Sequence, residues 1–130
     1  PEGLTRLLVH VQDEYSGPAG VPLYVTENGA SYNDELVIEN GAKRVHDRER
    51  TEFVRAHLGA VVDAVDQGVD VRGYFYWSLL DNFEWAWGYD KRFGIVRVDY
   101  DTQERTLKDS GREYSRIVAA RAVDVSAARN

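Results

Sequence analysis

Residues 20–34 have the sequence GVPLYVTENGASYND, and the fold class is inferred outward from this stretch. Val21–Val25 form a continuous apolar run, which is typical of a parallel strand covered on both faces. Glu27 stands where the run ends, and Gly29 is expected to let the backbone turn away sharply. Parallel α/β folds carry their chemistry at the carboxyl ends of strands, so Glu27 is a candidate functional residue. On this stretch alone, a solvated glutamate in an Asn-Gly turn is the commoner arrangement, and that alternative stays open.

The tripeptide Glu-Asn-Gly, which first occurs at residues 27–29, recurs at Glu39-Asn40-Gly41. The run before this copy, ELVI, is short and begins with an acidic residue. Residues 28–46 hold two Asn-Gly pairs and little periodicity, so we predict a loop across them. Within it, Glu39-Asn40-Gly41 is predicted to be a surface turn of the Asn-Gly type. Glu39 is therefore expected to be exposed, whereas Glu27 ends a buried strand.

Helical and extended patterns alternate along the chain. Asp47 is predicted to cap the second helix, which closes near Gly68, and Ser110–Glu113 has the pattern of a capping box. Extended runs occupy residues 21–26 and 71–80, with a briefer one within 93–101. Three sets of apolar residues recur at helical spacing, namely Leu4, Leu7, Leu8 and Val11; Phe53, Ala56, Leu58, Val61, Val62 and Val65; and Tyr114, Ile117 and Val118.

The order helix, strand, helix, strand, helix predicts an α/β fold with a parallel sheet. Two parallel strands do not make a stable sheet by themselves, and a closed eight-stranded barrel needs about 250 residues. The chain has 130 residues. We therefore predict an incomplete α/β unit whose neighbouring strands lie elsewhere.

The composition narrows the function classes. The formal net charge is -6 and no basic block stands out, which argues against nucleic acid or an anionic membrane as a partner. No apolar run approaches the roughly 20 residues of a membrane span. Cysteine is absent, which excludes disulfides and thiolate metal sites and fits a cytoplasmic location. The chain begins at Pro1 and contains no methionine, so we expect it to be processed or to be a piece of a longer protein.

The second extended run leads into a stretch rich in aromatic and polar residues, YFYWSLLDNFEWAWGYDKRFG. Indole rings pack on the apolar faces of sugars, while carboxylates and amides bind sugar hydroxyls. The alternative is a buried aromatic cluster with a salt-bridged glutamate, but core clusters rarely carry so many polar groups. A carbohydrate site is therefore predicted from five residues of the exit loop, Asp81, Asn82, Glu84, Trp85 and Trp87.

Two of these stretches, VTENGA and YFYWSLLDNFEWAWGYDKRFGIVRVDY, resemble the C-terminal signatures of family 1 glycoside hydrolases, the β-glucosidase family. The segments PEGL, HDRER and RTLKDSGREY also resemble that family, so the similarity runs from Pro1 to about Val118. The resemblance implies the C-terminal part of a (β/α)8 TIM barrel, with its last two strands and their flanking helices. Residues 1–130 would then be one partial catalytic domain, in which Glu113 and Leu107 stand where many relatives have Trp and Pro.

The resemblance also implies roles for individual residues in the hydrolysis of terminal β-glycosidic bonds with retention. Glu27 matches the catalytic nucleophile. Trp77 matches a tryptophan beneath the sugar, and Glu84 and Trp85 match the pair that binds its outer hydroxyls. Phe93 matches an aromatic residue that closes the same subsite. The family varies at Trp87, which remains a candidate contact for the aglycone.

A retaining glycosidase needs a second carboxyl group as acid/base, which in this family lies in an Asn-Glu-Pro motif on an earlier strand. This chain has no such motif. The expected partners are therefore the N-terminal remainder of the barrel and a β-glucoside or cello-oligosaccharide substrate, with no cofactor and no metal. His10, His46 and His57 are expected to be structural or solvated. The alternative function is a non-catalytic, truncated-barrel module that binds sugar or a partner.

Overall fold

The computed structural model describes residues 1–124, and the chain divides into two compact units. Of the described residues, the first unit contains Pro1–Asn28, Arg55–Phe75, Val123 and Asp124. The second unit contains Gly29–Val54 and Tyr76–Ala122.

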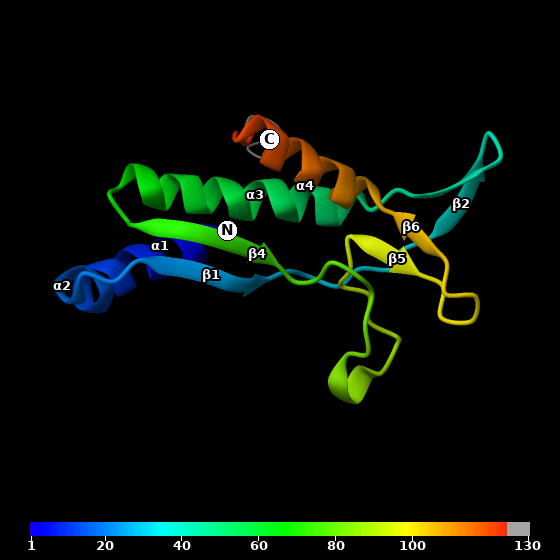
Figure 1. Cartoon of the computed structure of the whole chain (residues 1–130), viewed down its shortest axis with the longest axis horizontal. Coiled ribbons are helices and arrows are strands. Elements are labelled where there is room, and N and C mark those ends of the chain that lie inside the picture. Colours follow the sequence, from blue (N-terminus) through cyan, green and yellow to red (C-terminus); the bar gives the residue numbers. More distant parts are fainter. Residues whose placement is uncertain (125–130) are drawn as a thin grey trace. The chain divides into compact units, whose positions relative to one another are not determined.

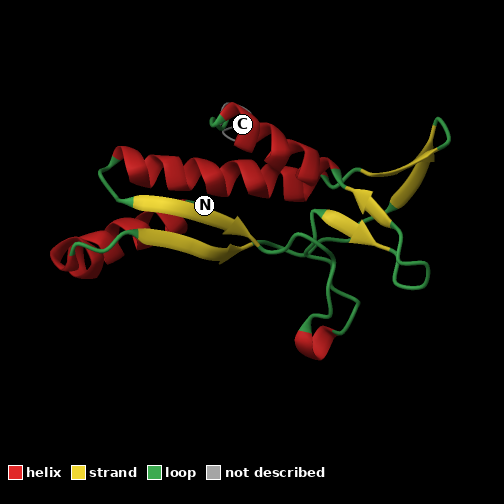
Figure 2. Cartoon of the chain, in the orientation of Figure 1, coloured by secondary structure: helices red, strands yellow, loops and turns green. Residues whose placement is uncertain are grey.

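Helices and strands alternate through the first unit in the predicted order. Helical conformation continues through Pro18 and stops at Gly20, whose φ is 66°. Figure 2 distinguishes these helices from the strands. In chain order the elements are α1 (Glu2–Val11), the π-helical segment η1 (Gln12–Ser16), α2 (Gly17–Ala19), β1 (Leu23–Asn28), the later turns of α3 (Arg48–Asp66), and β4 (Val71–Tyr76), whose last residue belongs to the second unit.

Strands β1 and β4 are hydrogen-bonded neighbours in a two-stranded sheet, and both run in the same direction (Figure 1). Leu23 and Val25 point one way and are partly buried, whereas Tyr24 is 53% exposed. The prediction that this strand is covered on both faces is therefore wrong for the described chain. The physical reason is that helices of the first unit cover one face of the sheet only.

The core of the first unit lies between the helices and the covered face of this sheet. Leu8, Ala64 and Val69 are buried, and the side chains packed against them are Leu4, Val9, Leu23, Val25, Val61 and Val71. The predicted core positions Leu7, Val62 and Val65 are exposed. Small residues allow α1 and α3 to approach closely, as the 2.9 Å hydrogen bond from Thr5 Oγ1 to the Ala60 carbonyl shows. The contact face of α3 therefore follows its alanines and not its largest apolar side chains.

The second unit contains a hairpin where a loop was predicted. Strand β2 (Leu36–Glu39) pairs antiparallel with β3 (Ala42–Val45), so that Glu39 lies opposite Ala42. Asn40 and Gly41 have φ values of 51° and 76°, as a two-residue hairpin turn requires. The Asn-Gly turn is thus confirmed, and Glu39 is exposed as expected, but it ends a strand. The short acidic ELVI run lacks the period-two pattern that would have predicted this strand.

The remaining elements of the second unit lie within the aromatic stretch and after it. The η2 turn (Trp85–Trp87) comes first, and β5 (Val96–Val98) then pairs antiparallel with β6 (Arg105–Leu107), in agreement with the brief strand predicted there. Helix α4 (Asp109–Ala120) completes the unit. Its apolar face was predicted only in part, because Ile117 is buried whereas Val118 is exposed.

The predicted capping box at the start of α4 is wrong. Lys108 occupies the N-cap position, without a side-chain hydrogen bond to the helix. Ser110 instead lies inside the first turn, where its hydroxyl donates to Asp47 Oδ2 at 2.5 Å. Glu113 is buried and forms a bidentate ion pair with Arg116, in which Nε donates to Oε2 at 2.9 Å and Nη2 donates to Oε1 at 2.7 Å. A tertiary contact with Asp47 therefore occupies the Ser110 side chain, and an ion pair within α4 occupies that of Glu113.

Candidate active site

Glu27 is the last residue but one of β1, at the carboxyl end of the strand. Its side chain is exposed, and no other described residue forms a hydrogen bond or ion pair with its carboxylate. The adjacent Asn28 is held in place, because its Oδ1 accepts a 2.8 Å hydrogen bond from the Tyr74 hydroxyl on β4. This contact between the two strands fixes the backbone from which Glu27 projects.

Gly29, the first residue of the second unit after Glu27-Asn28, is required for a different reason from the one predicted. Its φ lies outside the left-handed region, so no sharp turn demands glycine there. A β-carbon at this position would lie 1.7 Å from the carbonyl oxygen of Trp77. Backbone packs directly on backbone at this point, and no other residue fits without a shift of the chain.

Trp77 and Phe93 are neighbours through their backbones. Ser78 N donates to the Phe93 carbonyl at 3.3 Å, and Ile95 N donates to the Ser78 carbonyl at 3.0 Å. The peptide bond between Trp77 and Ser78 is cis. Both aromatic side chains are partly buried. The structure thus brings together two of the predicted sugar-binding residues that are far apart in the sequence.

Glu84 and Trp85 lie in a closed turn within the same loop. Glu84 N donates to the Gly88 carbonyl at 2.7 Å, and Trp87 N donates to the Glu84 carbonyl at 2.8 Å. Trp85 has a φ of 43°, a strained conformation for a bulky residue, and its side chain is 84% exposed. Trp87 is also exposed, and Lys91 Nζ lies 5.1 Å from the centre of its ring.

The carboxylate of Glu84 is oriented by a neighbouring amide. Asn82 Nδ2 lies 3.2 Å from Glu84 Oε2, and Asn82 Oδ1 lies 3.1 Å from Ser78 Oγ. Glu84 is partly buried, whereas Ser78 is buried. Asn82 therefore links a polar group in the interior of the second unit to the predicted sugar-binding carboxylate.

Asp81 is a structural residue and not the sugar ligand that its place in the exit loop predicted. Its side chain is fully buried and forms ion pairs with Arg92 at 2.5 Å and Lys108 at 2.8 Å. The backbone amides of Gly94 and Val98 also donate to it, at 3.0 and 3.3 Å. A carboxylate with these partners has no lone pair left for a substrate hydroxyl.

Asp81 belongs to a larger buried network that sequence reasoning missed. Lys108 also binds Asp34 at 2.5 Å, and Arg50 binds Asp34 and Asp47 at 2.8 and 2.5 Å. Burial by itself lowers the pKa of Arg50, but the hydrogen bonds and charges of the two aspartates outweigh it and raise that pKa. With Arg92, three cations face three carboxylates, so the charges balance. No local pattern signals the pair of Lys108 and Asp34, because these residues are 74 residues apart in sequence.

His46 lies between two carboxylates of the second unit. Its Nε2 is 3.0 Å from Glu39 Oε1, and its Nδ1 is 2.6 Å from Asp109 Oδ2. The hydrogen bond to Asp109, followed by that to Glu39, raises the pKa of His46. The side chain is half exposed. The imidazole therefore has a structural contact, joining the β2–β3 hairpin to the start of α4.

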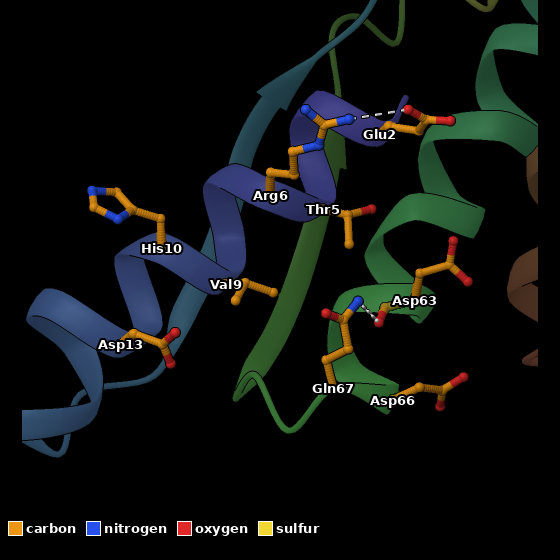
Figure 3. Close-up of a pocket in the computed structure, with 9 residues that line it drawn as sticks. All are labelled: Glu2, Thr5, Arg6, Val9, His10, Asp13, Asp63, Asp66 and Gln67. Carbon is orange, nitrogen blue, oxygen red and sulfur yellow. Dashed lines mark hydrogen bonds and ion pairs between the residues drawn. The ribbon is translucent and has the colours of Figure 1, made fainter.

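Two hollows on the surface are lined by none of the residues for which a catalytic or sugar-binding role is predicted, namely Glu27, Trp77, Glu84, Trp85 and Phe93. One, in the first unit, has a volume of about 630 Å³ and lies between α1 and the end of α3 (Figure 3). It is lined by Glu2, Thr5, Arg6, Val9, His10, Asp13, Asp63, Asp66 and Gln67. The other, in the second unit, has a volume of about 280 Å³ and is lined by Ser31, Tyr32, Asn33, Asp90 and Lys91.

Residues 1–124 lack two further kinds of feature. Within them, no group of three or more histidine, aspartate or glutamate side chains is arranged to hold a metal ion. None of the helices in this range is both long enough and apolar enough to cross a membrane.

The solved structure of a family 1 β-glucosidase from Thermotoga maritima superimposes on this chain with a TM-score of 0.86 and 49% sequence identity. The superposition covers 95% of this chain and 27% of the Thermotoga maritima chain. The chain is thus the C-terminal part of a (β/α)8 TIM barrel, in agreement with the predicted fold class. The glycosyl hydrolase family 1 model matches residues 1–123, and the chain belongs to this family.

The curated relatives agree with this assignment. Beta-glucosidase A of Thermotoga maritima is 53% identical over 118 residues, which are 91% of this chain and 25% of the relative. A bifunctional beta-D-glucosidase/beta-D-fucosidase of Bifidobacterium breve is 51% identical over a segment that makes up 92% of this chain and 25% of the length of that relative. The chain therefore spans about a quarter of the length of the curated relatives that it matches. Solved structures of the Thermotoga maritima enzyme include complexes with castanospermine and with noeuromycin.

Proposed function

We propose that this chain supplies the nucleophile and part of the sugar subsite of a retaining β-glucosidase. The observation that carries the proposal is the position of Glu27, exposed at the carboxyl end of β1 with no protein partner among the described residues. Barrel enzymes carry their chemistry at this end of their strands. Membership of a glycosidase family at about half identity to named β-glucosidases adds support.

The proposed reaction has two displacements. A Glu27 carboxylate oxygen bonds to the anomeric carbon as the bond from that carbon to the aglycone oxygen breaks, and the aglycone oxygen takes a proton from the acid/base. Water then attacks the glycosyl-enzyme, the acid/base takes the proton of that water, and Glu27 is released. Retaining enzymes hold the two carboxyl groups about 5–5.5 Å apart. The acid/base is proposed to come from the N-terminal remainder of the barrel.

Four residues of the second unit are proposed to bind the sugar. Trp77 and Phe93 offer partly buried aromatic faces, and Glu84 offers a carboxylate for sugar hydroxyls. Trp85 is held at positive φ with its indole exposed, a strained conformation of the kind found at ligand-binding positions. Trp87, exposed in the same turn, is proposed to contact the aglycone. Residues 1–130 would form one partial catalytic domain acting on β-glucosides or cello-oligosaccharides.

The test uses an assembled barrel, in which this chain replaces the matching quarter of the Thermotoga maritima enzyme. Glu27→Gly should abolish hydrolysis of nitrophenyl β-glucoside. Azide should restore turnover and yield the α-glucosyl azide, because azide then attacks from the face that Glu27 occupied. Formation of the β-glucosyl azide would assign Glu27 to the acid/base role instead. Unchanged hydrolysis by Glu27→Gly would overturn the proposal.

A non-catalytic sugar-binding module is the second candidate, favoured by the exposure of Trp85 and Trp87. Exposed indoles are the usual platforms of such modules. Titration of the purified chain with cellobiose, followed by tryptophan fluorescence, separates the two candidates. Saturable binding by the isolated chain, combined with an unaffected Glu27→Gly variant of the assembled barrel, would favour the module.

A further inference from the structure

We propose that Asn82 is a positioning residue that orients the Glu84 carboxylate and thereby tunes the choice between sugar epimers. The inference rests on the proposed sugar-binding role of Glu84. Asn82 is one of the polar residues of the exit loop from which a carbohydrate site is predicted. The contacts of Asn82 give it a narrower task, because it bonds to protein groups on both sides of its amide.

The amide of Asn82 has one orientation that satisfies its neighbours. Nδ2 lies 3.2 Å from the Phe83 carbonyl oxygen and 3.2 Å from Glu84 Oε2, so its two protons have two acceptors. Oδ1 lies 3.1 Å from the hydroxyl oxygen of Ser78, whose single proton is shared between Asn82 Oδ1 and the closer Leu80 carbonyl oxygen, at 2.7 Å. Turning the amide over would place its oxygen against two acceptors. The hydrogen-bonding partners therefore determine which side faces Glu84.

The inner end of this link is rigid. Ser78 is buried, and Asp81, directly before Asn82, is fixed by Arg92, Lys108 and two backbone amides. The Tyr100 hydroxyl lies 3.5 Å from the Asn82 carbonyl oxygen. A side chain attached to so constrained a backbone transmits that constraint to its hydrogen-bond partner. Asn82 and Glu84 are both partly buried, and Glu84, at the outer end, is the proposed ligand of the sugar.

The consequence concerns the two oxygens of Glu84. Oε2 is bonded to Asn82, so rotation of the carboxylate is restricted and Oε1 is presented in one direction. Glucosides and galactosides differ in the direction of a single hydroxyl. A carboxylate held in one orientation distinguishes the two directions, whereas a freely rotating one accommodates both. Loss of the Asn82 amide should therefore alter epimer preference through Glu84.

The experiment measures kcat/KM for nitrophenyl β-glucoside and β-galactoside in the assembled barrel. The ratio of the two values is independent of the fraction of folded enzyme, so a partly unfolded variant remains informative. We expect Asn82→Ala to change the ratio roughly tenfold, the effect of about one hydrogen bond to a charged group, with the change appearing mainly in KM. Glu84→Gln should change the ratio in the same direction. The double variant should match Glu84→Gln within about twofold, because coupled residues are not additive.

The controls separate this inference from the proposed function. Asn82→Asp removes both donors and places a second carboxylate beside Glu84, so it should exceed Asn82→Ala in effect, whereas Asn40→Asp in the β2–β3 turn should leave the ratio unchanged. If Glu84→Gln changes the ratio and Asn82→Ala does not, or if their effects add, the positioning role is overturned while Glu84 keeps its function. If Glu84→Gln itself leaves the ratio unchanged, Glu84 is not a sugar ligand and the positioning role of Asn82 is overturned with it, whereas the proposed role of Glu27, which Glu27→Gly tests, is unaffected.

Discussion

At the scale of single residues, Gly29 illustrates how one absent carbon constrains the chain just beyond Glu27. The atom that a side chain would meet is the Trp77 carbonyl oxygen, which is backbone and does not rotate away. Gly3, in the first turn of α1, has nothing within 4 Å of the same added carbon. The two glycines therefore offer a matched pair for substitution by alanine.

We predict that Gly29→Ala destabilises the assembled barrel by about 1–3 kcal/mol, the usual cost of overpacking, and lowers kcat. Gly3→Ala should be neutral or stabilise by up to about 1 kcal/mol, because alanine is the better helix former. Urea unfolding and nitrophenyl β-glucoside hydrolysis measure both effects. Equal stability of the two variants would show that the backbone at Gly29 moves apart without cost.

At the scale of elements, the β2–β3 hairpin is held to the rest of the second unit by ionic contacts. Lys43 on β3 pairs with Glu104, just before β6, and His46 pairs with Glu39 and Asp109. The two carboxylates raise the pKa of His46, so protonation of this residue is coupled to the docking of the hairpin on α4. The coupling gives the hairpin a pH-dependent attachment.

The sign of this dependence follows from the raised pKa. The stabilising contribution of His46 is fully present below its unfolded pKa of about 6.5 and is lost as the pH rises through the higher folded value. We predict that the thermal stability of the assembled barrel falls over this window, and that His46→Gln removes part of the fall. Glu39→Gln keeps the imidazole but removes one of its two carboxylate partners. It should therefore reduce the fall in thermal stability by less than His46→Gln does. The prediction would be contradicted if thermal stability fell equally steeply with pH in the unsubstituted barrel, in His46→Gln and in Glu39→Gln.

At the scale of the whole molecule, the buried network in the second unit links segments from across the chain. Lys108 contacts both Asp34 and Asp81, and its side chain is fully buried. Removing one member of a buried ion pair leaves the other without compensation, which commonly costs about 3–5 kcal/mol. Lys43, which is paired with Glu104 in a partly exposed position, provides the matched comparison.

We predict that Lys108→Met destabilises the assembled barrel by about 3–5 kcal/mol, whereas Lys43→Met costs about 0–1 kcal/mol. Added salt should reduce the Lys43 effect and leave the Lys108 effect nearly intact, because buried charges are poorly screened. Urea unfolding at low and high ionic strength measures both. A small effect at Lys108 would mean that the three aspartates find other partners.

The isolated 130-residue chain is predicted to be inactive and marginally stable. The described sheet of β1 and β4 has only two strands, and Tyr24 and Phe75 are exposed on it. Open edges and exposed apolar side chains favour aggregation. Without the acid/base, the leaving group departs unassisted, at a cost on the order of 10²–10⁴ in rate. Calorimetry and size-exclusion chromatography test the prediction, and a sharp unfolding transition of a monomer would favour the independent module.

Local sequence was sufficient wherever a short segment carries its own physical constraint. Val21–Val25 predicted a strand ending near Glu27, and Asn40-Gly41 predicted a turn because positive φ is least costly for these residue types. The alternation of helices and strands predicted the α/β class for the same reason. These features depend on periodicity and backbone preference, which neighbouring residues alone determine.

Tertiary structure decided the features that depend on distant partners. The exposure of Tyr24, the contact face of α3 and the pairing of Lys108 with Asp34 all depend on what lies across the fold. Asp81 and Ser110 were assigned local roles because their neighbours in sequence fit those roles, whereas their actual partners lie 11 to 63 residues away. A charged side chain pairs with whatever the folded backbone brings within about 3 Å, and that proximity is set by packing and not by position along the chain.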